Sequence, residues 1–334
     1  MTPERPIRRV LVTGGAGFIG SHLVDFLLER GDRVTVLDDL STGRHANLAA
    51  ARQRHGAALR VVEGSVAERL DPSLGTFDLI FHLAAAVGVR LVVERPIHTI
   101  ETNVHETTAV LRAAAEFGTP VLITSTSEVY GKGVRTPFRE DDDVVYGPTT
   151  VSRWSYACSK AIDEYLALAY HRERDLPVVV VRLFNTVGPR QVGDHGMVLP
   201  RFVSRALAGQ PLEVHGDGGQ SRCFCDVRDV VPALVRLLEN RECRGRVFNL
   251  GHDRPITMLE LARAVVQALG SSSEIRTISY QEAFKVQFDD LRVRQPDLAR
   301  VREAIGFEPR IPLEQTIRDV AHAMAPGAGA GAGA

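Results

Sequence analysis

Short runs of Val, Ile and Leu alternate with helical stretches from Arg9 to Leu183, and this alternation constrains the fold most strongly. Parallel strands covered by helices on both faces are nearly continuous in apolar residues. The predicted strands are Val10–Thr13, Val34–Leu37, Leu59–Glu63, Leu79–Leu83, Val121–Thr124 and Val178–Leu183. The predicted helices between them include Ile19–Arg30, Asn103–Phe117 and Ser155–His171. The pattern therefore predicts an α/β fold built on a doubly wound parallel sheet.

The pattern changes after Arg190. Residues 191–320 mix short helices, isolated strands and Gly/Asp turns such as Gly216–Gly219, which is typical of a smaller, substrate-binding lobe. We expect residues 1–190 to form the main domain, with parts of the later chain interleaved. Residues 326–334 repeat Gly and Ala and predict a disordered tail.

Composition argues against several classes of function. Lys and Arg number 40 against 41 Asp and Glu, a formal net charge of -1, so we expect neither nucleic acid nor an anionic membrane surface as a partner. The charged N-terminus lacks an apolar segment, and no later run reaches the ~18 apolar residues of a membrane span. We therefore expect a cytoplasmic protein. The four cysteines are too few for a disulfide framework, and Cys223 and Cys225 lack a partner set, so we expect packed thiols and no metal.

A glycine-rich turn, residues 13–20, joins the first predicted strand directly to a helix. Glycines permit a tight turn and let the backbone approach a pyrophosphate at the helix N-terminus. Asp38 ends the second strand, where a carboxylate bonds ribose hydroxyls and repels a 2′-phosphate. Arg44 lies nearby in the sequence, and its positive charge would instead attract a 2′-phosphate. The combination predicts a Rossmann-type domain that binds NAD. The expected cofactor-binding residues are Gly14, Gly17, Phe18, Ile19, Gly20, Asp38, Leu83, Ala84 and Ala85, together with Tyr156 and Lys160.

Tyr156 and Lys160 lie one turn apart on one face of a predicted helix. A lysine ammonium beside a phenol stabilises the phenolate and lowers its pKa from ~10, which makes a base that takes a hydroxyl proton while nicotinamide takes a hydride. Alone, such a pair is more often an ordinary helix surface. Ser127 and Glu128 follow the fifth strand, at the sheet edge where ligands bind, and this position favours catalysis.

These motifs resemble the extended short-chain dehydrogenase/reductase family over about residues 8–320, and so do Arg182–Asn185 and Gly188–Arg190. Within that family, Ser125–Gly131 (STSEVYG) resembles the UDP-glucuronate decarboxylases. Three further stretches point the same way: Pro96–Asn103, similar to the segment before the dimer helix, residues 219–229, similar to a phosphate-binding region, and Arg294–Asp297. The resemblance implies a homodimer formed through helices 103–117 and 155–171.

The resemblance also implies a role for each residue. Tyr156 is the expected base, Lys160 its partner and Ser127 a contact to the reacting sugar hydroxyl. Glu128 is expected to handle a proton at carbon 5, and Arg294 to hold the substrate carboxylate. The expected substrate-binding residues are Asn185, Arg190 and Arg222 near the diphosphate, Val214 and His215 near uracil, and Arg294.

These roles amount to oxidation of carbon 4 of UDP-glucuronate, loss of carbon dioxide, and release of UDP-xylose or its 4-keto form. Ser127 stands where dehydratases have Asp, which disfavours 4,6-dehydration. The stretch Ala84–Val89 differs from the proline-rich stretch of eukaryotic-type decarboxylases, so a UDP-sugar 4-epimerase remains an alternative. Arg294 before Pro-Asp can also cap a helix or bind phosphate. A non-catalytic NAD sensor is disfavoured because it has no need of Tyr156 and Lys160.

Overall fold

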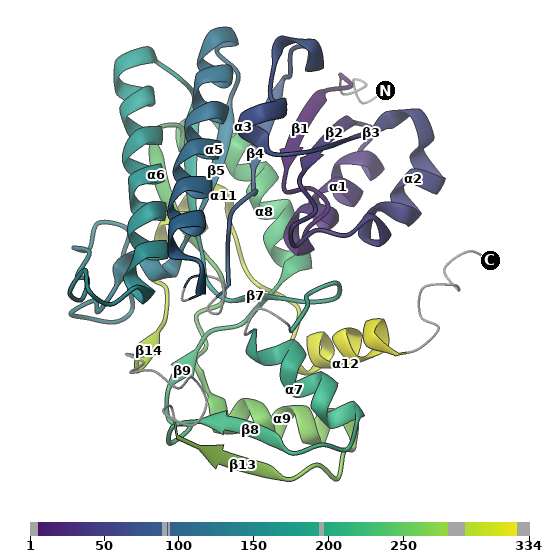
Figure 1. Ribbon diagram of the computed structural model, residues 1–334, viewed down its shortest axis with the longest axis vertical. Helices are drawn as coiled ribbons and strands as arrows, with labels where there is room; N and C mark the ends of the chain where they lie inside the picture. The colour runs from purple at the N-terminus through teal and green to yellow at the C-terminus, as the bar shows by residue number, and fades with distance from the viewer. Residues whose placement is uncertain (1–5, 89–91, 93, 194–196, 280–290, 326–334) are drawn as a thin grey trace.

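A seven-stranded parallel sheet forms the centre of the computed structural model, which describes residues 6–88, 92, 94–193, 197–279 and 291–325 (Figure 1). The sheet order is β11-β6-β5-β4-β1-β2-β3, and every neighbouring pair is parallel. This confirms the predicted doubly wound parallel sheet. The predicted tail, 326–334, and Val89 lie outside the described residues. The strands are β1 (Arg9–Thr13), β2 (Arg33–Asp38), β3 (Leu59–Glu63), β4 (Leu79–His82), β5 (Val121–Thr126), β6 (Val178–Leu183) and β11 (Arg246–Leu250).

The apolar runs form strands whose two faces are covered by helices packed on both sides of the sheet. All but the last residue of β6, VVVVRL, are buried, and this lack of alternation is characteristic of a strand covered on both sides. The six predicted strands agree with the structure to within two residues at each end. The seventh strand, β11, comes from the later part of the chain and pairs with β6 at the edge of the sheet.

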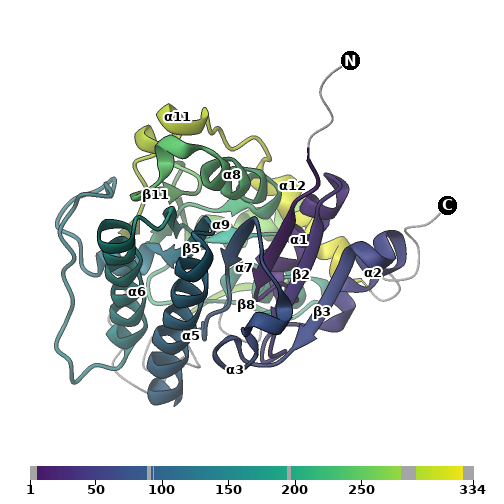
Figure 2. The same ribbon diagram turned by 90° about the horizontal axis from the view of Figure 1, so that it is seen from above.

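Helices cover the two faces of the sheet in separate layers (Figure 2). The core on one face includes Leu23 and Leu234, and on the other it includes Val110 and Ala167. The first layer consists of α1 (Phe18–Glu29), α8 (Val227–Glu239) and α11 (Ala299–Ile305), with α2 (Ala49–His55) beside α1. The second consists of α3 (Val66–Arg69), α5 (Pro96–Phe117) and α6 (Arg153–Arg174).

Helix α5 begins at Pro96, seven residues before the predicted start at Asn103. Proline suits the first helical position, because its ring fixes φ and its missing N–H would have no partner there. The helix ends at Gly118, whose φ of 63° is the left-handed conformation of a helix C-cap. The stretch Pro96–Asn103, expected to precede the dimer helix, is therefore the first two turns of that helix.

A second core lies beside the sheet, below it in the view of Figure 1. It is enclosed by α7 (Val198–Leu207), α9 (Met258–Leu269), α12 (Leu313–Met324), β8 (Leu212–His215) and β13 (Ile275–Ile278). The pair β7 (Thr186–Val187) and β10 (Cys225–Asp226) and the set β9 (Ser221–Arg222), β12 (Ile256–Thr257) and β14 (Val293–Arg294) complete the described strands. The division into two domains at residue 190 stays a prediction.

Candidate active site

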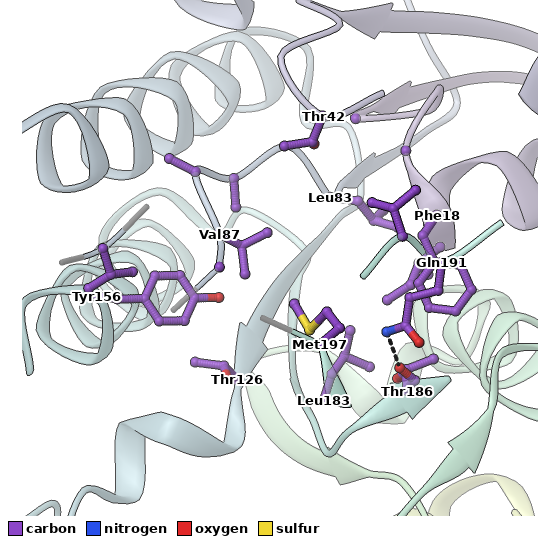
Figure 3. A pocket seen from close by; sticks show the side chains of 18 of the residues that line it. Phe18, Thr42, Leu83, Val87, Thr126, Tyr156, Leu183, Thr186, Gln191 and Met197 are labelled. Atoms are coloured by element: carbon purple, nitrogen blue, oxygen red, sulfur yellow. Dashed lines mark hydrogen bonds between the residues drawn. The ribbon is translucent and has the colours of Figure 1, made fainter. Parts of the chain in front are cut away.

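A cavity of about 1330 Å³ lies between the carboxyl ends of the parallel strands and the second core. It exceeds the ~300–1,000 Å³ of an ordinary small-molecule site, so it has room for a dinucleotide and a second ligand. β1 lies between β2 and β4, and such a reversal of strand order is where open α/β sheets bind ligands. In Figure 3 the Tyr156 hydroxyl points into the cavity from α6, and Phe18 and Gln191 lie on the opposite side.

The glycine turn forms one wall of this cavity. Gly14 has a φ of 67°, and a Cβ there would lie 2.7 Å from the Ala84 nitrogen. A Cβ at Gly20 would overlap the Gly14 carbonyl oxygen, so the close packing of turn and helix requires glycine at both positions. Helix α1 begins after Gly17 without a capping side chain, which leaves the first amides of the helix available to a phosphate.

Asp38 lies beside this turn at the end of β2. Its Oδ2 accepts the Ala16 N–H at 2.8 Å and its Oδ1 accepts the Leu40 N–H at 2.9 Å, and burial raises its pKa. These bonds hold the carboxylate at the cavity wall, where the remaining lone pairs can accept ribose hydroxyls. Turn, helix start and carboxylate together fit a dinucleotide with a free 2′-hydroxyl.

The loop after β4 is held close to the turn. The Ala84 N–H donates to Thr13 Oγ1 at 3.3 Å, and His82 Nδ1 bonds the same hydroxyl at 2.7 Å. Burial lowers the pKa of His82 to about 3, so this histidine is a neutral packing residue. Leu83, Ala84 and Ala85 all line the cavity. All nine residues expected to bind the cofactor through turn, strand end or loop therefore border one space.

Tyr156 and Lys160 reach the cavity from α6. Burial raises the pKa of Tyr156, and the negative charges of Glu128 and Asp163 raise it further, whereas a hydrogen bond with Thr126 lowers it. The sequence argument expected Lys160 to lower this pKa, and the structure corrects that expectation. The Lys160 ammonium donates to Asp163 Oδ2 at 2.7 Å, so its charge is largely offset by the carboxylate beside it.

The Lys160–Asp163 pair is buried, with side-chain exposures of 2% and 0%. Removing one partner of a buried pair leaves the other charge uncompensated. We expect Asp163→Asn to lower the free energy of unfolding by about 3 kcal/mol, measured by urea denaturation of the ligand-free protein. Glu29→Gln is the control, because it breaks the exposed Arg54–Glu29 pair and should change little. Equal effects of the two substitutions would contradict the prediction.

The end of β5 brings a hydroxyl and a carboxylate next to Tyr156. Ser127 and Glu128 begin a short 3₁₀ turn, and Thr126 accepts the Glu128 N–H at 3.2 Å. All three residues line the cavity. Sequence reasoning chose Ser127 as the hydroxyl residue of this site. Ser127 lines the cavity with an exposure of 2%, and Thr126 supplies a second hydroxyl near Tyr156.

Arg294 enters the same place from β14. Its NH1 donates to Glu128 Oε1 at 3.3 Å across 166 positions of sequence, and its buried Nε has no hydrogen-bond partner among the described residues. It does not cap α11, because Asp297 accepts the Ala299 N–H there. An Arg with a spare donor beside a carboxylate can bind a second, incoming anion.

The predicted substrate residues occupy the part of the cavity toward the second core. Asn185, Arg190, His215 and Arg222 line it, but Val214 does not. Val214 is fully buried among the apolar side chains of the second core. Side chains alternate along a strand, so in β8 the neighbours of Val214 face the cavity while Val214 faces the core. The Val214 side chain thus belongs to the second core, and the expected position of Val214 and His215 near uracil stays a prediction.

Several cavity residues were missed by sequence reasoning. Arg201 bonds His215 Nε2 at 2.7 Å and the Glu213 carbonyl at 3.2 Å. Glu106 of α5 also lines the cavity. Charged residues inside helices look like ordinary surface positions in a sequence, and no local signal marks these. The other missed charged residues are Asp39, Glu94, Arg95, Arg153 and Glu213.

Within the described ranges, no group of three His, Cys, Asp or Glu side chains is arranged to hold a metal ion. All four cysteines are free thiols, and Cys223, Cys225 and Cys243 are buried. In the same part of the chain, no helix has both the length and the apolar character that crossing a bilayer requires.

Comparison with known proteins extends these observations. The model of the NAD dependent epimerase/dehydratase family matches residues 10–251. The chain is 38% identical to a UDP-N-acetyl-alpha-D-glucosaminuronate decarboxylase of Bacillus cytotoxicus, over 93% of this chain and 96% of that protein. It is 39% identical to UDP-glucuronic acid decarboxylase 4 of Arabidopsis thaliana, over 93% of this chain and 67% of that protein.

A solved structure agrees with the sequence matches. UDP-glucose 4-epimerase of Thermotoga maritima, determined with UDP-glucose, superposes with a TM-score of 0.84 at 30% identity, covering 94% of this chain and 98% of that one. The likeness extends over both the sheet and the second core. Because the family model spans most of the chain and full-length relatives share well over 30% identity, the chain belongs to the NAD dependent epimerase/dehydratase family, and its cofactor is NAD, as the glycine turn and Asp38 predicted.

Proposed function

We propose that this protein is a UDP-glucuronate decarboxylase. The observation that carries the proposal is Arg294, which pairs with Glu128 next to the Tyr156 hydroxyl and keeps a buried Nε without a partner among the described residues. Such an arginine can bind a substrate carboxylate, because guanidinium and carboxylate match in geometry and charge. The relatives named as decarboxylases of uronic-acid nucleotides support the same reading.

The proposed reaction depends on the formation of a ketone at carbon 4 of the sugar. Bound NAD supplies a hydride acceptor and, once reduced, a hydride donor. Tyr156 removes the proton of the carbon 4 hydroxyl. A ketone at carbon 4 is β to the carboxylate. When carbon dioxide leaves, the electrons of the broken carbon–carbon bond therefore stay on the sugar and are delocalised into an enolate. We assign to Glu128 the delivery of a proton to carbon 5. The product is UDP-xylose, or its 4-keto form if release comes early.

Positions for the remaining residues follow from the same assignment. We place Lys160 at the nicotinamide ribose and Ser127 at the sugar. Asn185, Arg190 and Arg222 are placed at the diphosphate, and His215, oriented by Arg201, near the uracil. Cationic side chains at this end of the cavity suit a ligand that carries two phosphates.

A second substrate is favoured by one observation. The Bacillus relative, matched over 96% of its length, is named for a uronate that carries an N-acetyl group. A 4-epimerase is the alternative class, supported by the structural likeness to the Thermotoga enzyme.

Mass spectrometry of the nucleotide sugar tests the proposal directly. The protein is incubated with NAD and either UDP-glucuronate or UDP-N-acetylglucosaminuronate. Loss of the mass of one carbon dioxide from UDP-glucuronate is the expected result. Loss only from the N-acetyl sugar would change the substrate, and an unchanged mass with a new chromatographic peak would replace decarboxylation by epimerisation.

We also propose that two copies of the chain pair through α5 and α6. Ile97 and Tyr165, one on each helix, are 72% and 68% exposed, and Ile100 and Ile162 are exposed beside them. Apolar side chains gathered on one surface favour a protein interface. A cytoplasmic location stays a prediction from the sequence.

A charged residue on this surface should separate the copies. We expect Ile162→Glu to convert a dimer to a monomer in sedimentation velocity, because a carboxylate is costly to bury at an apolar interface. Leu207→Glu is the control, since Leu207 is 50% exposed on α7, away from this surface. A wild-type monomer, or a dimer that survives Ile162→Glu, would reject the interface.

A further inference from the structure

Glu106 is a buried carboxyl group in the cavity wall for which the proposed reaction has no use. It lies on α5 and is 6% exposed. Its Oε1 accepts the Val66 N–H and the Ser65 hydroxyl, each at 3.4 Å. Its Oε2 makes no hydrogen bond with any described residue, and Glu106 borders the cavity. The group is therefore held at one oxygen while the other can accept from a ligand.

The position of Glu106 identifies the part of the ligand that it faces. Asp38 ends β2 and takes the ribose of the adenosine half. β3 lies next to β2, farther from β5 and Tyr156, and the Gly64 N–H after β3 donates to the Asp38 carbonyl at 2.9 Å. Ser65 and Val66 follow at once. A base attached to the ribose at Asp38 and directed away from Tyr156 therefore meets the wall that Glu106 supports.

The electrostatic surroundings of Glu106 call for a hydrogen-bond donor. Burial raises its pKa to about 7, the Val66 N–H opposes the rise, and the charges of Asp39 and Asp38 add to it. An acceptor oxygen near two further carboxylates disfavours a carbonyl oxygen opposite it and favours an N–H group. Adenine carries such a group, its exocyclic amine, whereas hypoxanthine has a carbonyl oxygen at that position.

We propose that Glu106 accepts a hydrogen bond from the exocyclic amino group of the cofactor's adenine and thereby selects adenine over hypoxanthine. Glu106 is then a specificity-determining residue of the cofactor site, supplied by α5 rather than by the glycine turn. The inference concerns cofactor binding alone, so its test needs no sugar substrate and is independent of the proposed reaction.

The test compares the Kd of NAD with that of deamino-NAD, in which hypoxanthine replaces adenine. Protein freed of nucleotide is titrated by calorimetry in a buffer well above the Glu106 pKa, so that the carboxylate is ionised. The wild type is expected to bind NAD about 10- to 100-fold more tightly, the usual weight of a hydrogen bond to a charged group. Equal affinity of the wild type for the two dinucleotides would overturn the proposal.

Glu106→Gln should change this preference in a specific direction. The Val66 N–H and the Ser65 hydroxyl both need an acceptor, so the amide oxygen turns to them and the amide NH₂ faces the cavity. An NH₂ group suits the carbonyl of hypoxanthine and opposes the amine of adenine. The ratio of the two Kd values is expected to fall at least about tenfold. The ratio also cancels the general effect of removing a negative charge near the diphosphate.

Two further variants complete the experiment. Glu106→Ala should abolish the preference without reversing it, because it offers neither donor nor acceptor. Glu116→Gln, at an exposed position near the end of the same helix, should keep the wild-type ratio. Circular dichroism and urea denaturation show whether each variant is folded. A folded Glu106→Gln protein with the wild-type ratio would overturn the proposal.

Discussion

Tyr156→Phe is expected to lower kcat by about 10²- to 10⁴-fold, the usual weight of a general base. The phenol points into the cavity (Figure 3), so removing its oxygen removes the proposed acceptor for the carbon 4 proton. The Phe ring fills the same space in the wall, so affinity for NAD should not change. Single-turnover formation of NADH from UDP-glucuronate, followed by absorbance, measures the affected step directly.

Tyr165→Phe is the matched control, because Tyr165 lies on the same helix but is 68% exposed. It should retain wild-type turnover. A Tyr156→Phe protein that binds NAD normally and still reduces it at the wild-type rate would show that another group removes the proton. Such a result would remove the basis for catalysis by the Tyr156–Lys160 pair.

Arg294→Gln is expected to weaken binding of UDP-glucuronate by at least about 30-fold and to suppress release of carbon dioxide, because an unpaired buried charge costs ~2–5 kcal/mol. The substitution removes the positive charge that would bind the substrate carboxylate and that pairs with Glu128. UDP-glucose has no carboxylate, so its affinity should change far less. Calorimetric Kd values for the two nucleotide sugars, with NAD present, separate carboxylate binding from a general disturbance of the site.

Arg292→Gln is the control for this change. Arg292 lies two residues away, is 75% exposed and pairs with Asp217 on the surface, so its removal should alter neither Kd. Equal losses for UDP-glucuronate and UDP-glucose in Arg294→Gln would mean that Arg294 orders Glu128 or binds a phosphate. Phosphate binding is one of the alternatives that the sequence left open.

The six predicted strands were recognisable because most of their residues are buried between the two layers of helices. Burial on both faces requires a nearly unbroken run of apolar residues, as in β6, and such a run can be recognised from the local sequence. The glycine turn was predictable for a related reason. Gly14 and Gly20 have neighbours that exclude a Cβ, so the backbone geometry itself selects the residue type.

The start of α5 carries a local signal, Pro96, that the prediction of a helix from Asn103 leaves out. Pro96 was assigned to a segment before the helix, although proline at a first helical position is a start signal. Val214 shows a different limit. A strand of four residues, β8, has too few alternating positions to reveal which face is buried, and only the packing of the second core against it settles the question.

The catalytic centre depended on contacts that no spacing encodes. Lys160 is bound to Asp163, an i, i+3 pair that looks like any helix surface until both side chains are seen to be buried. The pKa of Tyr156 is raised instead of lowered because the phenol is buried and lies near the negative charges of Glu128 and Asp163. Glu106 likewise becomes significant only because the chain after β3 is folded against α5.

The sequence by itself determined the parallel sheet, the glycine turn with Asp38, and the Tyr156–Lys160 spacing, because each of these is imposed by backbone geometry or burial within a few neighbouring residues. The tertiary structure alone decided that Arg294 meets Glu128 across 166 positions, that Thr126 lies near the phenol, and that Glu106 borders the cavity beside Val66. Those contacts arise where separate elements pack together, and their energy depends on burial and on opposing charges that a linear sequence does not contain.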